Sequence, residues 1–137
     1  PEKTAESFQD GWFKTGDLGR FDEHGHVILC GRGRELIISG GFNIYPQEVI
    51  NCLVEHPAVC EAAVIGVPDE RWGEQVRAIV VLKAGQKADA DARIRHCAGK
   101  LAKYKVPSSV EFRSSLPMSA MGKVLRRVLR DEERDKA

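Results

Sequence analysis

The order of apolar and polar residues in the first part of the chain predicts short strands separated by turns. Residues 18–21 and 27–30 have the composition of two strands, and Gly25 in the polar turn between them supplies the positive φ of a tight turn. Another short strand is predicted at residues 35–38, followed by a glycine loop. A helix is predicted to begin at Pro46, because the apolar residues after it recur on one helical face.

The rest of the chain contains two longer apolar runs. Residues 59–67 and 76–82 are rich in Ala, Val and Ile and predict paired buried strands around a polar turn that holds Trp72. The elements predicted after them are a helix at 89–101, a short strand at 110–112, a loop at 116–122 and a charged helix at 123–134. Strands and helices mix with short connections, so the predicted fold class is α+β: a short mixed sheet flanked by helices and preceded by a β-hairpin.

A polar break at Arg32-Gly33-Arg34 is a candidate domain boundary. Residues 1–33 are interpreted as the tail of a preceding domain, and residues 34–137 as a second domain with a complete core pattern of its own. The chain opens within a polar segment and without an initiator Met, so we expect it to be a fragment of a longer protein.

Composition excludes several classes of partner. With 42% hydrophobic and 30% charged residues the chain is an ordinary globular protein, and its net charge of +1 gives no field to recruit nucleic acid or an anionic membrane. Residues 126–136 alternate basic and acidic side chains, which predicts a solvated helix. We find no transmembrane segment and no signal peptide in the sequence, and we expect a cytoplasmic protein.

The cysteines carry no metal or redox motif. Cys30, Cys52, Cys60 and Cys97 lie far apart, form no CxxC pair and have no His at ligand spacing. They are predicted to be reduced and mostly buried thiols, and no metal site is expected.

Two side chains near the polar break suit a nucleotide. Asp17 follows a glycine at the mouth of the predicted hairpin, where its carboxylate can accept two hydrogen bonds from ribose hydroxyls or can simply close a turn. Arg32 offers a fork of donors for ribose or phosphate oxygens, and the alternative is a solvated surface arginine.

Two further features suit a ligand with an extended arm and an aromatic base. Ser39-Gly40-Gly41 has no Cβ on its last two residues, so a ligand can approach the backbone, although a plain turn explains it equally. Trp72 lies in a polar turn, where a partly exposed ring offers a stacking surface for adenine. The alternative is an indole folded back on the core.

Lys123 is the strongest catalytic candidate. Its ammonium is a compact charge that suits a carboxylate and an α-phosphate meeting in one pocket, and Gly122 before it lets the backbone enter a crowded site. The alternative is one more base in a basic helix.

Four segments occur in a fixed order: Gly11-Trp-Phe-Lys-Thr-Gly-Asp17, the stretch from Gly31-Arg32 to Pro46-Gln-Glu48, Leu101-Ala-Lys-Tyr104-Lys-Val-Pro107, and Pro117-Met-Ser-Ala-Met-Gly-Lys123. Together they resemble the late core motifs of the adenylate-forming (AMP-binding) superfamily, which includes acyl-CoA synthetases, aryl-CoA ligases, luciferases and peptide-synthetase adenylation domains. The resemblance covers essentially the whole chain. It identifies the chain as the C-terminal domain of an acyl- or aryl-CoA synthetase, with the hairpin as the tail of a missing N-terminal domain.

The resemblance implies a role for each candidate residue. Lys123 is catalytic in adenylation and binds the nucleotide, together with Asp17, Arg32 and Asn43. Arg34 stands at the hinge, where the family has more often Asp and sometimes Lys. The residues implied for CoA binding are Ser39, Gly40, Gly41, Trp72 and Tyr104. The lysines that flank Tyr104 could meet the CoA phosphates.

The implied reaction has two steps. A fatty or aryl carboxylic acid attacks ATP to give an acyl-adenylate, and the CoA thiol then displaces AMP. The implied cofactors are ATP and Mg²⁺, held mainly by the missing N-terminal domain of the same polypeptide, with CoA as co-substrate, and the fragment alone should be inactive. Two alternatives stay open: an adenylating domain that loads a carrier-protein thiol, and a non-catalytic α+β interaction module.

Overall fold

The computed structural model of the chain describes residues 2–136. The chain divides into two compact units, residues 1–34 and 35–137, one residue after the boundary expected from the polar break. The assignment of this division to a joint between two enzyme domains remains a proposal.

The first unit contains a short helix and two hairpins. Its elements are α1 (Glu2–Glu6), β1 (Phe8–Gln9), β2 (Trp12–Phe13), β3 (Asp17–Phe21) and β4 (Val27–Arg32). The β3–β4 hairpin is the one predicted from the sequence, with a bulge between Leu18 and Gly19. The β1–β2 hairpin was not predicted, and it turns through Asp10 and Gly11, both at positive φ.

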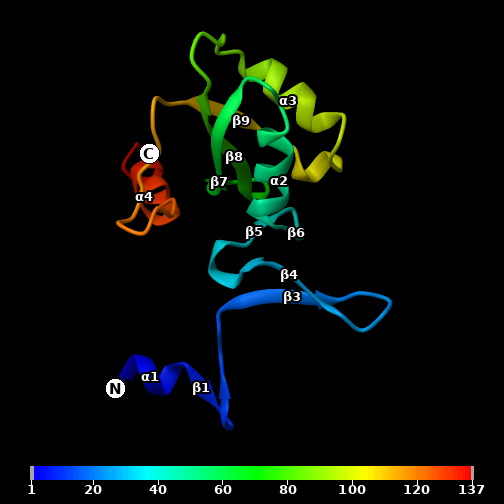
Figure 1. Cartoon of the computed structure of the whole chain (residues 1–137), viewed down its shortest axis with the longest axis vertical. Helices are drawn as coiled ribbons and strands as arrows, with labels where there is room; N and C mark the ends of the chain where they lie inside the picture. Colours follow the sequence, from blue (N-terminus) through cyan, green and yellow to red (C-terminus); the bar gives the residue numbers. More distant parts are fainter. Residues whose placement is uncertain (1, 137) are drawn as a thin grey trace. The chain divides into compact units, whose positions relative to one another are not determined.

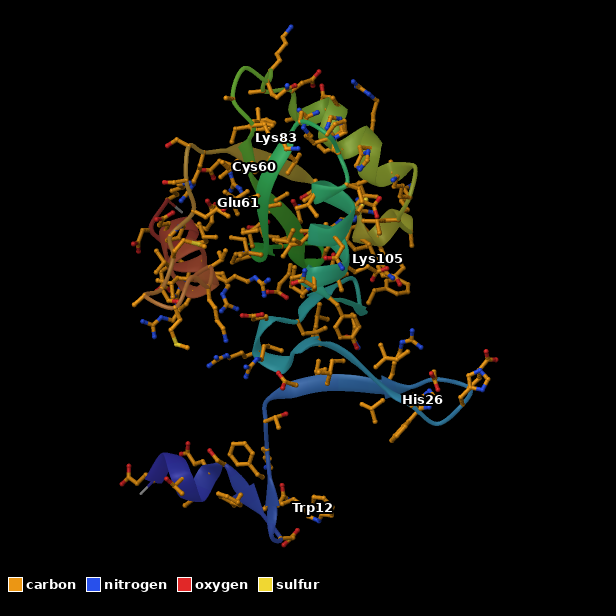
Figure 2. All side chains as sticks on the ribbon, viewed as in Figure 1. Trp12, His26, Cys60, Glu61, Lys83 and Lys105 are labelled. Atoms are coloured by element: carbon orange, nitrogen blue, oxygen red, sulfur yellow. The ribbon has the colours of Figure 1, made fainter. Side chains whose placement is uncertain are left out.

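The first unit has no core of its own. Among its described residues no side chain is buried. Trp12, which Figure 2 shows projecting from the ribbon, is 79% exposed, and Phe8, Phe13 and Phe21 are also more than half exposed. Apolar surface of this extent is typical of a segment that another part of a protein covers.

The second unit is built on a three-stranded mixed sheet. The order is β7-β8-β9, with β7 (Val59–Asp69) antiparallel and β9 (Ser109–Phe112) parallel to the central strand β8 (Gly73–Leu82). A separate two-stranded hairpin joins β5 (Ile37–Ser39) to β6 (Phe42–Ile44) and precedes the sheet in sequence. The single-turn helices η1 (Gly33–Glu35) and η2 (Lys103–Lys105) complete the connections.

Helices cover both faces of this sheet (Figure 1). One face packs against α2 (Pro46–Val54) and α3 (Ala90–Ala98), and the other packs against α4 (Arg126–Lys136). Alternate residues along β8 therefore enter two different apolar clusters, Ala78 and Val80 on the first side and Ile79 and Val81 on the second. Burial on both faces explains why β7 and β8 read as continuous apolar runs in the sequence. The predicted α+β class is confirmed.

Two helices differ from their predicted limits. The helix predicted at 89–101 ends at Ala98, and its buried positions are Arg93 and Cys97, one helical turn apart. The helix predicted from residue 123 begins only at Arg126, because Gly122 adopts φ +78° and the segment before the helix is extended. Lys123 therefore lies in a loop.

The cysteines follow the prediction in part. Cys52 and Cys97 are buried free thiols, as predicted for most of the cysteines, whereas Cys60 is exposed on β7. Cys60 falls where β7 and β8 shift register, and this turns its side chain to solvent. The side chain of Cys30 lies outside the described structure. Within residues 2–136, no helix is long and apolar enough to cross a membrane, and no three His, Cys, Asp or Glu side chains are grouped to hold a metal ion.

Candidate functional site

An aromatic cavity lies between the β5–β6 hairpin, the start of β8 and η2. Its volume is about 480 Å³, and its lining residues are Ser39, Gly40, Phe42, Trp72, Gln75, Val76, Lys103, Tyr104, Val106 and Ser108. Phe42 and Tyr104 stack with their ring centroids 4.5 Å apart and their planes at 21°. Phe42, Trp72 and Tyr104 remain 54%, 47% and 39% exposed. These three partly exposed aromatic rings around one cavity suit a planar aromatic ligand.

Trp72 is held by its own turn. One carboxylate oxygen of Asp69 accepts the amides of Trp72 and Arg71, at 2.7 Å and 2.9 Å. The guanidinium of Arg71 lies 4.7 Å from the centre of the indole. The indole is half exposed, so the prediction of an exposed ring is confirmed and the alternative of an indole folded onto the core is wrong.

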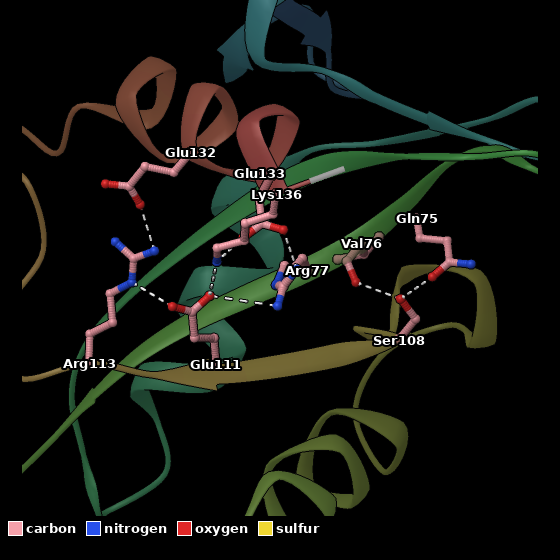
Figure 3. Close-up of polar contacts among 9 residues, drawn as sticks. All are labelled: Gln75, Val76, Arg77, Ser108, Glu111, Arg113, Glu132, Glu133 and Lys136. Atoms are coloured by element: carbon pink, nitrogen blue, oxygen red, sulfur yellow. Dashed lines mark hydrogen bonds and ion pairs between the residues drawn. The ribbon is translucent and has the colours of Figure 1, made fainter.

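The same turn is linked to the opposite wall of the cavity. The Gln75 side chain bonds Asp69 on one side and accepts the Ser108 hydroxyl at 2.9 Å on the other, as Figure 3 shows for Gln75 and Ser108. The Ser108 hydroxyl also lies 3.0 Å from the Val76 carbonyl. Sequence reasoning missed Gln75 and Ser108, since residues so far apart in the chain give no local pattern.

Gly40 is in direct contact with Trp72, and Gly41 is not. The Gly40 amide donates to the Trp72 carbonyl at 2.8 Å, and a Cβ on Gly40 would lie 2.9 Å from Cε3 of the indole. Gly41 has φ +83°, but a Cβ there would meet nothing within 4 Å, and it does not line the cavity. Of the two predicted glycines, the structure brings only Gly40 to the aromatic site.

The two lysines beside Tyr104 differ. Lys103 lines the cavity. Lys105 instead donates to both carboxylate oxygens of Glu48 at 2.9 Å, and this hydrogen bonding raises the pKa of Lys105. An ammonium held by a carboxylate is a poor partner for a phosphate, so Lys103 is the better candidate. Asn43 is exposed on β6 opposite Ile38 and does not line the cavity.

Asp17 and Arg32 form a pair in the first unit. They are register partners on β3 and β4, and Arg32 Nε lies 2.9 Å from the Asp17 carboxylate. Arg32 also donates to the Thr15 carbonyl at 3.1 Å, and the Thr15 hydroxyl accepts the Asp17 amide at 3.1 Å. Arg32 and Arg34 line a cavity of about 600 Å³ together with Glu6, Ser7, Lys14, Thr15, Gly16 and Gly33. The pair presents polar oxygens and donors suited to a sugar hydroxyl.

Lys123 lies on an exposed loop with an ordered backbone. The Ser119 amide donates to the Lys123 carbonyl at 2.7 Å, the Lys123 amide donates to the Ser119 hydroxyl at 3.2 Å, and Met118 and Val124 form a β-bridge. Lys123 does not line the aromatic cavity. Within residues 2–136 its ammonium takes no ion-pair partner, so the charge is available to a ligand.

Helix α4 is fastened to the sheet by charged side chains (Figure 3). Arg77 on β8 pairs with Glu133, and Arg113 pairs with Glu132 at 2.6 Å. Glu111 on β9 pairs with both arginines and with Lys136. The prediction that this helix is merely solvated is therefore wrong, because one of its faces forms ion pairs with residues of the sheet and of the segment after β9.

The start of the helix is also fixed to the segment that opens the second unit. Arg126 pairs with Glu35, and both side chains are largely buried. The loop that carries Lys123 is thus held between an ion pair at its C-terminal end and a β-bridge across it.

Comparison with known proteins gives a consistent set of relatives. Residues 48–123 match the family model described as AMP-binding enzyme C-terminal domain. A long-chain-fatty-acid–CoA ligase of Bacillus subtilis is 50% identical over 97% of this chain, which spans 24% of that relative. A fatty acid–[acyl-carrier-protein] ligase of Streptomyces coeruleorubidus, ScoC, is 47% identical over 96% of the chain and 25% of its own length.

A solved structure extends the likeness to three dimensions. The crystal structure of ATP-bound MatB from Rhodopseudomonas palustris is 46% identical, with a TM-score of 0.90, over 99% of this chain and 27% of that one. The chain thus spans about a quarter of the length of the relatives that it matches.

Proposed function

Because this chain belongs to the family of AMP-binding enzyme C-terminal domains, within the adenylate-forming superfamily, we propose that it is the C-terminal part of an acid–CoA ligase. The whole enzyme activates a fatty or aryl carboxylic acid with ATP, releasing pyrophosphate, and the thiol of CoA then displaces AMP from the acyl-adenylate. The chain alone is inactive, since the large N-terminal domain of the same polypeptide carries the acid pocket.

The observation that carries the acceptor half of this proposal is the aromatic cavity. The exposed indole of Trp72 and the stacked rings of Phe42 and Tyr104 offer faces for the adenine of CoA. Lys103 also lines the cavity, where its ammonium can pair with the phosphates of CoA. Gly40, which lacks a side chain, lets the indole of Trp72 pack directly against the loop that lines the cavity.

The adenylation half uses other residues. The Asp17–Arg32 pair takes the ribose hydroxyls of ATP, and Asn43 faces the nucleotide. Lys123 places its ammonium where negative charge gathers between the attacking carboxylate and the α-phosphate, and stabilises that transition state. ATP with Mg²⁺ is held mainly by the N-terminal domain, and the proposed location is the cytoplasm.

Residues for the two steps occupy different parts of the chain. The second unit carries the cavity on the β5–β6 and η2 side and Lys123 in the loop before α4, on the other side of the sheet. We therefore propose that the unit turns about Arg34 between the steps and presents one of these surfaces in each.

The nearest alternative is transfer to a carrier-protein thiol. The likeness to the ScoC ligase supports it, because that relative is named for an acyl-carrier-protein acceptor. Both acceptors bring a pantetheine thiol, but only free CoA brings an adenine. The half-exposed Trp72 therefore favours CoA. The non-catalytic alternative predicts that Lys123 is freely replaceable.

An acceptor assay on the full-length enzyme tests the proposal. Pre-made acyl-adenylate is mixed with CoA, with pantetheine, or with a carrier protein bearing phosphopantetheine, and thioester formation is timed. We expect CoA to be used much more efficiently than pantetheine, and Trp72→Ala to remove most of that difference. Equal use of CoA and pantetheine, with the carrier protein preferred, would support the alternative.

A further inference from the structure

The β5–β6 hairpin, which lines the cavity, is joined by two hydrogen bonds to the turn before β8 and to the start of that strand. The Gly40 amide donates to the Trp72 carbonyl at 2.8 Å, and the Ile38 amide donates to the Glu74 carboxylate at 2.8 Å. Ile38 lies within β5, whereas Gly40 follows the strand at φ +56°. The Glu74 side chain thus supplies an acceptor that a neighbouring strand would normally provide with its backbone.

Glu74 occupies this place because Gly66 leaves room for it. A Cβ built on Gly66 would lie 2.6 Å from Oε1 of Glu74 and 3.0 Å from its carboxyl carbon. Gly66 has no positive φ, so conformational freedom does not explain the glycine. Its missing side chain is instead the space into which the carboxylate folds on its way to Ile38.

The loop that follows Ile38 depends on such anchors. Gly40 and Gly41 both adopt positive φ, and glycines in this region are intrinsically free to take other conformations. Ser39 and Gly40 line the cavity, whereas Glu74 does not. Glu74 therefore has no direct contact with a ligand in the cavity, and its hydrogen bond to Ile38 connects it to the loop.

We propose that Glu74 is a positioning residue for the acceptor step: its carboxylate holds the Ile38 amide and thereby sets the Ser39–Gly41 loop against Trp72 for entry of the pantetheine arm. This inference rests on the proposed acid–thiol ligase function. The proposed adenylation step uses Lys123, the first unit and Asn43, and Asn43 is the register partner of Ile38 in the same hairpin. Adenylation should therefore depend on Glu74 less than transfer does.

Three substitutions in the full-length enzyme separate this role from others. Glu74→Ala removes the acceptor, and Glu74→Gln keeps an oxygen that can accept from Ile38. Gly66→Ala displaces the carboxylate, and its Cβ would also lie 3.3 Å from Cγ1 of Ile37. The matched control is Glu61→Ala, which removes an exposed carboxylate from β7 (Figure 2). Single-turnover transfer from pre-made acyl-adenylate and single-turnover adenylation are measured separately.

Loss of a charge-assisted hydrogen bond should slow transfer about tenfold in Glu74→Ala, with a clearly smaller loss in adenylation. Gly66→Ala should behave alike, Glu74→Gln should recover most of the rate, and Glu61→Ala should match the parent. Equal loss in both steps, or no recovery in Glu74→Gln, would overturn the positioning role.

Amide hydrogen exchange on the same proteins separates failure of this inference from failure of the proposed function. Exchange of residues 38–41 should accelerate in Glu74→Ala and Gly66→Ala, and not in Glu61→Ala, whichever acceptor the enzyme uses. Unchanged exchange of this segment would overturn the anchoring by Glu74. An enzyme that anchors the loop in this way but transfers to neither CoA nor a carrier thiol would instead contradict the proposed function.

Discussion

Of the two glycines in the Ser39–Gly41 loop, only Gly40 is in contact with the aromatic site. The motif alone does not distinguish Gly40 from Gly41, since both lack a side chain and both have positive φ. The indole of Trp72 against Gly40 makes the distinction, and only the folded chain brings these residues together. In the same way, the bond from Glu74 to Ile38 joins a side chain to a distant backbone amide, and no periodicity in the sequence reports it.

The two glycines provide a matched pair of substitutions. Both Gly40→Ala and Gly41→Ala introduce strain at positive φ, on the order of 1 kcal/mol. Only Gly40→Ala also drives a methyl group into the Trp72 ring. We expect the apparent KM for CoA in the full-length enzyme to rise about tenfold more in Gly40→Ala than in Gly41→Ala. Equal effects would show that the Trp72 contact is irrelevant.

Among the elements, the hydrophobic pattern predicted best those with a buried face. α2, β7 and β8 lie where the sequence placed them, because helical periodicity or an apolar run reports a core. β3 and β4 were also predicted although they bury no described side chain, since the turn at Gly25 marks their hairpin. The β1–β2 hairpin was missed although Asp10-Gly11 is a strong turn signal, since its exposed residues show no alternation. The pairing of α4 with the sheet was missed because charge order along a helix does not reveal its partners.

The ion pairs beneath α4 should contribute to stability. The Glu133 side chain is only 9% exposed and pairs with Arg77, whose Nε already lacks a partner in the described structure. Glu133→Ala should lower the free energy of unfolding by about 1–3 kcal/mol, because it removes one of the two carboxylates that pair with the largely buried Arg77. Asp131→Ala, which removes a more exposed pair with Arg134, should cost less than about 0.5 kcal/mol. Denaturant titration of the 137-residue chain gives both values.

The contact between the end of α2 and α3 should make stability depend on pH. Burial, then the Arg93 and His96 charges, lower the pKa of His56 from its ordinary 6.5, and Arg93 is only 4% exposed. His96 bonds the Cys52 carbonyl, and nearby Glu55 is paired with Lys100.

The unfolded chain then binds the His56 proton more tightly than the folded chain. The contribution of neutral His56 to the free energy of unfolding is therefore fully present above pH 6.5 and is lost as the pH falls below it. Denaturant titrations between about pH 5 and pH 8 should show this slope, and His56→Asn should reduce it. A slope that is unchanged in His56→Asn would assign the effect to other groups.

At the scale of the whole molecule, the two units differ in what supports them. Residues 35–137 enclose two apolar clusters, whereas the described part of residues 1–34 buries no side chain. The polar break at Arg32–Arg34 lies beside this division, and its meaning as a joint between two domains stays a prediction. The family resemblance named Trp72 and Tyr104 for one ligand, but it did not predict Phe42, which stacks on Tyr104 only in the folded chain.

Removal of residues 1–34 should therefore leave a folded domain. We expect residues 35–137 to unfold in one cooperative transition, with a denaturation midpoint close to that of the second unit in the longer chain. Tryptophan fluorescence from Trp72, the remaining indole, reports the transition. A non-cooperative or already unfolded chain would place the boundary elsewhere.

The central claim is that one domain serves two chemical steps with two different surfaces. The most direct test is single-turnover measurement of both half-reactions in the full-length enzyme carrying Lys123→Ala or Trp72→Ala. Lys123→Ala should slow acyl-adenylate formation ~100-fold or more, while transfer from pre-made acyl-adenylate to CoA stays close to normal. Trp72→Ala should leave adenylation intact and raise the CoA requirement of transfer about tenfold. Equal damage to both steps by either substitution would contradict the account.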